Sequence, residues 1–165
     1  MPIPAFPPFS RRSVLQLAAA GAALSTVSAC AATPRVYRLA VNRDAGCGCC
    51  QGWMTLMQRS GRFRATMRDE PDMKALKRRL GVPADLASCH TAEVEGYVIE
   101  GHVPSADIIR LLEQRLAGVR GLAVPDMPIG SPGMEQGGGG RDAFDVFAFR
   151  ADGGRAVLTH YAAQS

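Results

Sequence analysis

The chain has 165 residues, of which 47% are hydrophobic and 21% charged, so it has the composition of an ordinary globular domain with short accessory segments. Its formal net charge is +4, but from Cys30 onward 17 Lys and Arg stand against 15 Asp and Glu, a balance that gives no argument for nucleic-acid binding. The five cysteines are too few for a small disulfide scaffold, and chemistry at a site explains them better.

Residues 1–29 predict a cleaved export signal. The stretch Ser10–Leu15 resembles a twin-arginine (Tat) signal, and the apolar run Val14–Ala29 is shorter than the roughly 20 residues needed to span a bilayer. Val27-Ser28-Ala29-Cys30 resembles a lipobox, in which Cys30 becomes the lipidated first residue, and it also fits simple cleavage after small residues. In both cases we expect the mature protein in the periplasm, either free or anchored by lipid.

The first part of the domain predicts a strand and then a helix. Val36–Val41 alternates apolar and polar residues in part, as a strand does. The apolar stripe of the helix that follows has the spacing i, i+3, i+4, i+7 and consists of Cys50, Trp53, Met54 and Met57. Cys50 therefore belongs to the buried face, with Cys49 about 100° around the helix and Cys47 before the first turn.

The remaining elements alternate in the same way. A second strand is predicted at Phe63–Met67, and a helix opened by Pro71 ends near Leu80. Two short strands are expected within Thr91–Ile99, and then a helix that begins at Pro104, with its apolar stripe reaching Leu116. A loop of about 20 residues, 121–140, precedes a hairpin; its strands are Phe144–Phe149 and Ala156–Tyr161. Glu93, Glu95 and Glu100 are expected on a solvated face.

The order β-α-β-α-β-β-α predicts an α/β fold of the thioredoxin-like, and more specifically glutaredoxin-like, type. Residues 30–120 form this domain, and 121–165 add a Pro/Gly-rich loop and a β-hairpin that pack on it. Thioredoxin-like domains carry redox cysteines between the first strand and the first helix, where this chain has Cys-Gly-Cys-Cys at 47–50. The loop that faces those cysteines would contain Ser88–Thr91, so Cys89 is expected beside the cluster.

Four converging sulfurs permit more than one chemistry. Cys47 and Cys50 form a CxxC pair at a helix N-terminus, where thiolates are favoured, and a thiol–disulfide oxidoreductase needs only such a pair. Cys49 and Cys89 exceed that need. Thiolates at this density suit Cu(I), zinc or iron–sulfur clusters, but the spacings match neither zinc sites nor ferredoxins, so copper is favoured. One structural disulfide with spare thiols stays open as the simpler alternative.

Other side chains are weaker candidates for the site. Met127 and Met134 lie in the Pro/Gly-rich loop, where a thioether suits Cu(I) or, alternatively, fixes the loop onto the domain. His90 and His102 are candidate ligands or hydrogen-bonding neighbours of ligands. His160 is expected on the surface.

Three motifs together resemble the periplasmic CxCC copper-resistance family, the CopG-type copper-binding proteins, which are unrelated to the DNA-binding repressor of the same name. The motifs are AGCGCCQGW, SCHTAEVEGYVIEGHVP and GLAVPDMPIGSPGME. The resemblance, which covers Val36 to about Tyr161, implies a thioredoxin-like domain whose C-terminal extension helps to bind metal. It also implies a multinuclear, cysteine-bridged copper site, with ligands at Cys47, Cys49, Cys50 and Cys89, and interconversion of Cu(I) and Cu(II) in copper detoxification.

Three functions follow from these features. The first is periplasmic copper binding with redox cycling of the metal, as a copper oxidoreductase or without defined turnover. The second is a thiol–disulfide oxidoreductase that uses Cys47 and Cys50. The third is a redox-silent copper chaperone for an efflux partner. The expected partners are copper ions and a periplasmic efflux or chaperone protein, with no nucleic acid, and the chain is expected to be monomeric.

Overall fold

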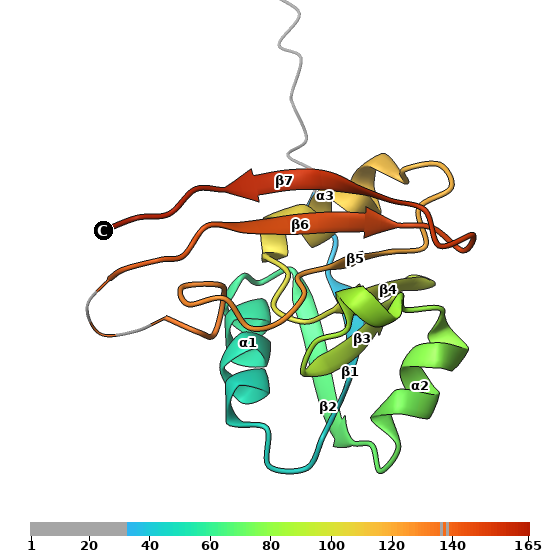
Figure 1. Cartoon of the computed structure of the whole chain (residues 1–165), viewed down its shortest axis with the longest axis horizontal. Coiled ribbons are helices and arrows are strands. Elements are labelled where there is room, and N and C mark those ends of the chain that lie inside the picture. Colours follow the sequence, from blue (N-terminus) through green and yellow to red (C-terminus); the bar gives the residue numbers. More distant parts are fainter. Residues whose placement is uncertain (1–32, 136, 138) are drawn as a thin grey trace, which may run out of the picture. The chain divides into compact units, whose positions relative to one another are not determined.

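The computed structural model describes residues 33–135, 137 and 139–165, and Pro34–Ser165 form one compact unit (Figure 1). The predicted export signal and Cys30 lie outside the described residues. Within the described part of the chain, no helix combines the length and the apolar character that crossing a membrane requires.

One mixed sheet of seven strands, in the order β2-β1-β3-β4-β5-β6-β7, forms the centre of the unit. Two neighbouring pairs, β1·β2 and β4·β5, are parallel, and the other neighbours are antiparallel. The strands are β1 (Tyr37–Arg43), β2 (Phe63–Asp69), β3 (His90–Val94), β4 (Tyr97–Glu100), β5 (Gly121–Ala123), β6 (Phe144–Phe149) and β7 (Arg155–Tyr161). The predicted α/β class and the predicted order of elements up to the third helix are confirmed.

Helices cover both faces of this sheet, because its strands alternate between two apolar cores. On β4, Ile99 joins the core formed with α1 (Gly48–Arg59) and α3 (Ser105–Gln114). Its neighbour Val98 joins the other core, under α2 (Met73–Leu80) and the short 3₁₀ helix η1 (Ala84–Leu86). Adjacent strand residues point to opposite faces, so one strand serves both cores. Figure 1 shows α1 and α2 on opposite sides of β1 and β3.

The predicted apolar stripe of α1 is confirmed. Cys50, Trp53 and Met57 are buried, and Met54 lies half-buried at the edge of the stripe. Cys47 is the N-cap residue in extended conformation, and Gly46 before it has φ +82°, in the region that glycine tolerates best. The chain therefore turns sharply after β1 and enters the helix with its cysteines in and next to the first turn.

The stretch predicted as a loop from Gly121 onward begins instead with a strand. All three residues of β5 are buried, and they pair with β4 on one side and with β6 on the other. The run Gly-Leu-Ala carries no strand signal of its own, since it lacks β-branched and aromatic residues. Tertiary pairing therefore decides its conformation.

The C-terminal hairpin of β6 and β7 is confirmed, and it is fixed to α3 by a buried carboxylate. Asp107 accepts hydrogen bonds from Thr159 Oγ1 at 2.6 Å and from Tyr161 Oη at 2.7 Å. Burial and the bond to Asp107 raise the pKa of Tyr161 to about 12, so the phenol stays protonated and keeps donating. The hairpin is thus part of the same sheet and the same packing unit.

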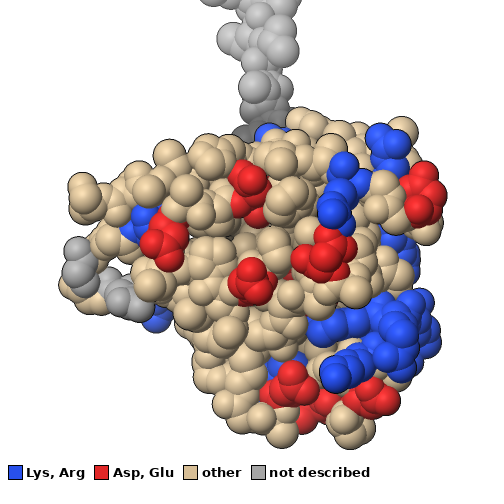
Figure 2. Space-filling view, viewed as in Figure 1, with Lys and Arg blue, Asp and Glu red and all other residues tan. Residues whose placement is uncertain are grey.

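Charged side chains of both signs are spread over the face seen in Figure 2, with the densest group of Lys and Arg over α2. Lys77, Arg78 and Arg79 occupy the last turn of this helix. Cations at a helix C-terminus interact favourably with the helix dipole.

A substitution at Gly121 would test how tightly β5 packs between its neighbouring strands. A Cβ atom at this position would overlap the carbonyl oxygen of Val98 and lie 2.7 Å from Phe149 Cζ. We expect Gly121→Ala to lower the free energy of unfolding by about 3 kcal/mol or more, because backbone cannot yield as a flexible side chain does. Urea denaturation followed by circular dichroism measures this loss. The control Gly140→Ala, whose nearest atom is 3.8 Å away, should change stability little, and equal losses in the two variants would contradict the packing described here.

Candidate metal centre

Four cysteine sulfurs meet at one end of the sheet. Cys47, Cys49 and Cys50 lie at the start of α1, Cys89 directly precedes β3, and their Sγ atoms lie within 4.8 Å of one another. The pairing of β1 with β3 brings them together, because Arg43 at the end of β1 is the partner of His90. The predicted position of Cys89 beside the CxCC cluster is confirmed.

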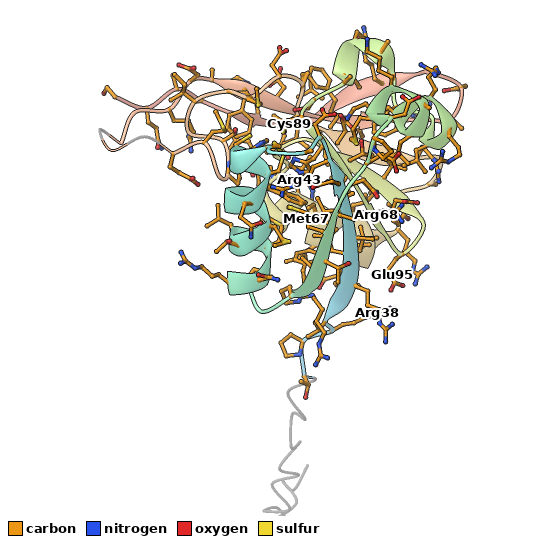
Figure 3. The ribbon with its side chains drawn as sticks, turned by 90° about the horizontal axis from the view of Figure 1, so that it is seen from below. Arg38, Arg43, Met67, Arg68, Cys89 and Glu95 are labelled. Atoms are coloured by element: carbon orange, nitrogen blue, oxygen red, sulfur yellow. A yellow bond between two sulfur atoms is a disulfide. The ribbon has the colours of Figure 1, made fainter. Side chains whose placement is uncertain are left out.

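Arg43 connects the end of β1 to the start of α1. Its Nη1 donates to the carbonyl oxygen of Cys47 at 2.8 Å, and its Nε donates to Asp69 Oδ1 at 3.0 Å. Figure 3 shows Arg43 and Cys89 at the same end of the sheet. The backbone at the N-cap cysteine is therefore held by a side chain from the neighbouring strand.

The four sulfurs are not equivalent. Cys47 and Cys50 form a disulfide, whereas Cys49 and Cys89 are free thiols. Cys50 is fully buried, and the other three are half-buried. Cys49 Sγ lies 3.5 Å from Cys47 Sγ. In this oxidised form two sulfurs are available as thiols, and reduction of the disulfide by two electrons and two protons would make all four available.

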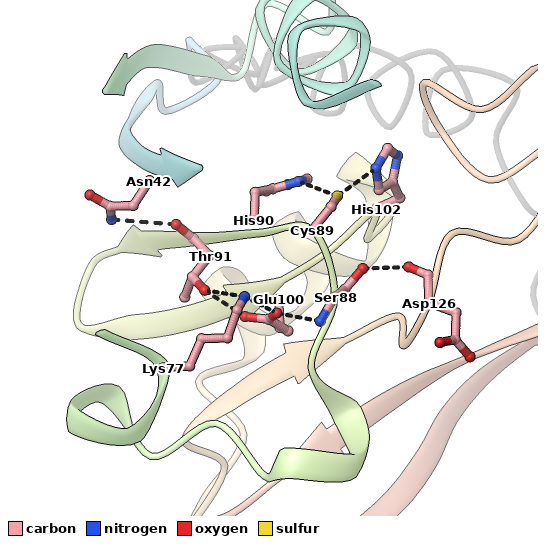
Figure 4. A network of polar contacts seen from close by, with 9 residues as sticks. All are labelled: Asn42, Lys77, Ser88, Cys89, His90, Thr91, Glu100, His102 and Asp126. Atoms are coloured by element: carbon pink, nitrogen blue, oxygen red, sulfur yellow. Dashed lines mark hydrogen bonds and ion pairs between the residues drawn. The ribbon is translucent and has the colours of Figure 1, made fainter. Parts of the chain in front are cut away.

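A second group of donors shares Cys89 with the first. Cys89 Sγ lies 3.2 Å from His90 Nδ1 and 3.1 Å from His102 Nε2 (Figure 4). Both imidazoles are completely buried. Three donor atoms, one from each of these residues, lie close enough together to hold a single ion. The two histidines that the sequence offered as weaker candidates are therefore brought to the site.

Hydrogen bonding sets the tautomer of His102. Its Nδ1 lies 2.7 Å from the carbonyl oxygen of Pro132, which can only accept, so Nδ1 carries the proton and Nε2 presents a lone pair to Cys89. The Cys89 thiol then donates to His102, which leaves its sulfur to accept from His90 Nδ1. His102 is thus prepared to act as a ligand, whereas His90 in this state is a donor to the sulfur.

Burial keeps these groups neutral in the metal-free protein. Desolvation, followed by the charge of Cys49, raises the pKa of the Cys89 thiol to about 12. Desolvation, followed by the charges of His102 and Lys77, lowers the pKa of His90 to about 3. The pKa of His102 is also lowered, chiefly by burial. Neutral imidazoles keep the lone pairs that metal ions need, while the thiol must give up its proton on binding.

The Pro/Gly-rich segment after β5 brings one of the two candidate methionines to the cluster. Met127 Sδ lies 3.7 Å from Cys49 Sγ, and the Met127 side chain is 46% exposed, so it is within reach of both the cluster and solvent. Met134 takes part in backbone hydrogen bonds that close the turn from Gly130. From the sequence Met134 is the favoured thioether of the two, because Gly133 before it gives it freedom, but the fold brings Met127 to the cluster instead.

The same segment passes close over α1 beside Trp53. Gly133 has φ +87°, and a Cβ atom there would lie 2.6 Å from the backbone nitrogen of Trp53. Trp53 is fully buried, donates from Nε1 to the carbonyl oxygen of Val103 at 2.9 Å, and its ring lies 4.5 Å from that of His90. Trp53, predicted on the buried face of the helix, therefore lies in the core directly beside the site.

Glu100 corrects an expectation from the sequence, which placed it on a solvated face with Glu93 and Glu95. Glu95 is exposed and Glu93 half-buried, but Glu100 is fully buried and forms an ion pair with Lys77. Strand alternation places Glu100 on the same face as Val98, under α2. No local signal marks this pair, because its two members come from separate elements.

The donor set fits a soft metal ion. Thiolate and thioether sulfurs with neutral imidazoles are the ligands that Cu(I) prefers, and no carboxylate belongs to either group of donors in the described part of the chain. His90 Nε2 is buried and has no hydrogen-bond partner among the described residues, so it could take up the proton if Nδ1 became a ligand.

Comparisons with known proteins point in the same direction. A family model described as "Protein of unknown function, DUF411" matches residues 86–134. The solved structure "Copper resistance protein copG- Form 1" is 44% identical to this chain, covers 79% of it and 99% of its own length, and superposes with a TM-score of 0.71. "Form 2" of the same protein is also 44% identical and covers 77% of this chain and 99% of its own, with the same TM-score. Among curated protein sequences no match is found.

The buried His90 makes stability depend on pH in a predictable direction. Its folded-state pKa is lowered from about 6.5 to about 3, so the unfolded chain binds a proton between these values that the folded protein does not. The contribution of the neutral His90 to the free energy of unfolding is fully present above pH 6.5. It is lost as the pH falls toward 3, by about 1.4 kcal/mol per pH unit. Substitution by Gln removes the ionisable group, so the stability advantage of wild type over His90→Gln should shrink by about 2 kcal/mol between pH 7 and pH 5.

Urea denaturation of the metal-free proteins at both pH values measures this change. The matched control is His160→Gln, since His160 is exposed and contacts Asp145 on the hairpin. A stability difference at His90 that stays constant with pH would show that the buried imidazole is not held neutral.

Proposed function

Because this chain belongs to the family of the copper resistance protein CopG, we propose that it binds copper at the cluster of Cys47, Cys49, Cys50 and Cys89 and serves copper resistance or homeostasis. The observation that carries this proposal is the convergence of four sulfurs from two distant segments within 4.8 Å. A single thiol–disulfide pair would need only two of them. The cluster is able to bind metal, and copper is the ion that its soft donors favour.

We infer that the domain is thioredoxin-like with a C-terminal extension. Support comes from the neighbours β2-β1-β3-β4, in which β1 and β2 are parallel and β3 is antiparallel to β1. The cysteines follow β1 at the start of α1, and the loop before β3 faces them. On this assignment β5, the loop 124–143 and the hairpin of β6 and β7 are additions, and they supply Met127 and the carbonyl of Pro132 to the site.

A multinuclear copper site is supported by the two donor groups that meet at Cys89. One group offers only sulfur, and the other adds His90 and His102. Sulfur-rich surroundings suit Cu(I), whereas imidazole nitrogen is also a good ligand for Cu(II). A thiolate of Cys89 would bridge metal ions in the two groups, and the mixed donors support interconversion of the two oxidation states.

The proposed setting is the periplasm. It rests on the sequence of residues 1–29, with its twin-arginine pattern, and membrane attachment would follow from a lipid at Cys30. The proposed partners are copper ions and an efflux or chaperone protein that receives them, and the protein itself is proposed to act as a monomer. A redox-silent chaperone would use the same ligands without changing the oxidation state of the metal.

The Cys47–Cys50 disulfide favours a second candidate function, thiol–disulfide exchange. The pair has the CxxC spacing and lies at a helix N-terminus, as redox-active pairs do. Cys89 argues against this function, because a thiol facing the pair would intercept a mixed disulfide with a substrate.

Copper titration tests the first proposal. Reduced protein under anaerobic conditions should bind more than one Cu(I) per chain, and Ser at any of the four cysteines should lower that number, because a shared thiolate contributes to more than one ion. Metal analysis after removal of unbound copper measures the count. His102→Asn should lower the number as well, because His102 belongs to the second group of donors, and the control is His160→Asn, at an exposed position of the hairpin. One equivalent or none bound by the wild type would contradict a multinuclear site.

Insulin reduction separates the second candidate from the first. An oxidoreductase would keep its activity in Cys49→Ser and Cys89→Ser and lose it in Cys47→Ser, because only the CxxC pair carries that reaction. We expect the wild type to show little such activity beside a thioredoxin standard. Strong activity that survives both substitutions would favour the oxidoreductase and leave copper binding as a side reaction of its thiols.

A further inference from the structure

Glu100 is a buried carboxylate that shares no hydrogen bond with any described cysteine, yet it holds both sides of the loop that carries Cys89. Its Oε1 accepts from the backbone nitrogen of Ser88 at 2.6 Å, and its Oε2 accepts from Thr91 Oγ1 at 2.7 Å. Ser88 directly precedes Cys89, and Thr91 follows it by two residues. One side chain therefore binds the chain on both sides of the cysteine, through a backbone amide before it and a side-chain hydroxyl after it (Figure 4).

Lys77 completes this network from α2. Its ammonium group donates to Glu100 Oε1 and, at 2.9 Å, to Thr91 Oγ1, so Lys77, Thr91 and Glu100 form a closed ring of hydrogen bonds. The Lys77 side chain is 13% exposed and that of Glu100 is not exposed at all. Breaking a buried pair of this kind on one side leaves an uncompensated charge, which is far more costly than losing a surface pair.

Backbone geometry links the same carboxylate to the second histidine. Gly101, with φ +69°, turns the chain directly after Glu100, and a Cβ atom there would lie 2.6 Å from Ser88 Cβ. The next residue is His102, whose Nε2 reaches Cys89 Sγ at 3.1 Å. The segment 100–102 thus contacts the Cys89 loop twice, through the carboxylate at one end and the imidazole at the other.

On the basis of the proposed copper site, we propose that Glu100, charge-paired with Lys77, is a positioning residue of the metal centre that fixes Cys89 where the two donor groups share its sulfur. Cys89 is the only described residue common to both groups. Cys89 itself lies just before β3, which begins at His90, so strand pairing does not hold it in place. If the loop were free to move, the Cys89 sulfur would move away from one donor group or the other. A loop that is already fixed also loses less conformational entropy when its cysteine binds a metal ion.

A fold-stabilising role alone would give a different pattern of effects. A general loss of stability would expose Cys49 and Cys89 alike, whereas loss of positioning would act on Cys89 and spare Cys49. Cys49 lies on α1 and contacts Met127, and it shares no hydrogen bond with Glu100. The two free thiols of the disulfide form therefore make an internal comparison within one molecule.

The experiment compares Glu100→Gln with Glu93→Gln, which makes the same chemical change on the neighbouring strand at a half-buried position. The rate of iodoacetamide alkylation at each thiol of the metal-free protein is followed at pH 8 by mass spectrometry of peptides. In Glu100→Gln we expect alkylation of Cys89 to rise on the order of tenfold while that of Cys49 stays within about twofold, because the loop opens locally. Glu93→Gln should leave both rates unchanged.

Thr91 provides a second pair of variants if Glu100→Gln does not fold. Thr91→Val removes the hydroxyl that Glu100 and Lys77 share, and Thr91→Ser keeps it. The Val variant should show the selective increase at Cys89, and the Ser variant should restore the wild-type rate. Equal acceleration of both thiols, or no acceleration at Cys89, would overturn the positioning role.

Competition with a chromogenic Cu(I) chelator then tests the consequence for copper. Reduced Glu100→Gln should release Cu(I) at chelator concentrations on the order of tenfold lower than the wild type requires, with Glu93→Gln unchanged. Equal release from both variants and the wild type would overturn the link to the metal centre. A wild type that binds no Cu(I) would refute the proposed function instead, and the alkylation rates would still decide whether Glu100 positions Cys89.

Discussion

The antiparallel pairing of β1 with β3 is the constraint on which the candidate metal centre depends. It places the end of β1, and hence the CxCC cluster on the following turn, beside the residue at which β3 begins. Cys89 precedes that residue directly, so its position follows from the register. A shift by one residue would exchange the two faces of β3, moving Ala92 and Val94 out of the core under α1 and α3 and His90 away from Trp53. The apolar packing of β3 therefore specifies the sulfur cluster as firmly as it specifies the sheet.

The candidate metal centre has donor atoms of two kinds, some close to solvent and some fully buried. Cys49 and Met127 lie toward solvent, and in the proposed function their soft sulfur atoms would meet an incoming ion. His90 and His102 lie behind Cys89 in a fully buried layer, where their neutrality and their tautomers are fixed by burial and by hydrogen bonds. Two charged groups close to this layer, Lys77 and Glu100, form an ion pair with each other. The interior thus tolerates polar chemistry because nearly every member has a partner.

Much of this arrangement could be predicted from sequence, because it follows from local periodicity. The stripe of Cys50, Trp53 and Met57 marked both the helix and its buried face, and the alternation of elements was enough to expect Cys89 near the cluster. The strand β5 could not be predicted, since its pairing partners and not its residues make it a strand. The burial of Glu100 and the contact of Met127 likewise depend on segments far away in sequence. The oxidation state of Cys47 and Cys50 is a property of the folded pair that the spacing alone leaves open.

His102 donates its hydrogen bond to a backbone carbonyl, that of Pro132 in the segment after β5, and this has a consequence for how the family can vary. Every amino acid has a carbonyl group, so exchange of the side chain at 132 leaves the acceptor in place. Insertion or deletion between Val124 and Pro132 would instead move the carbonyl away, and His102 would be free to change its tautomer. Natural selection on this contact would therefore conserve the length of the loop more strictly than the identity of its residues. An alignment scored by residue identity alone would overlook this kind of conservation.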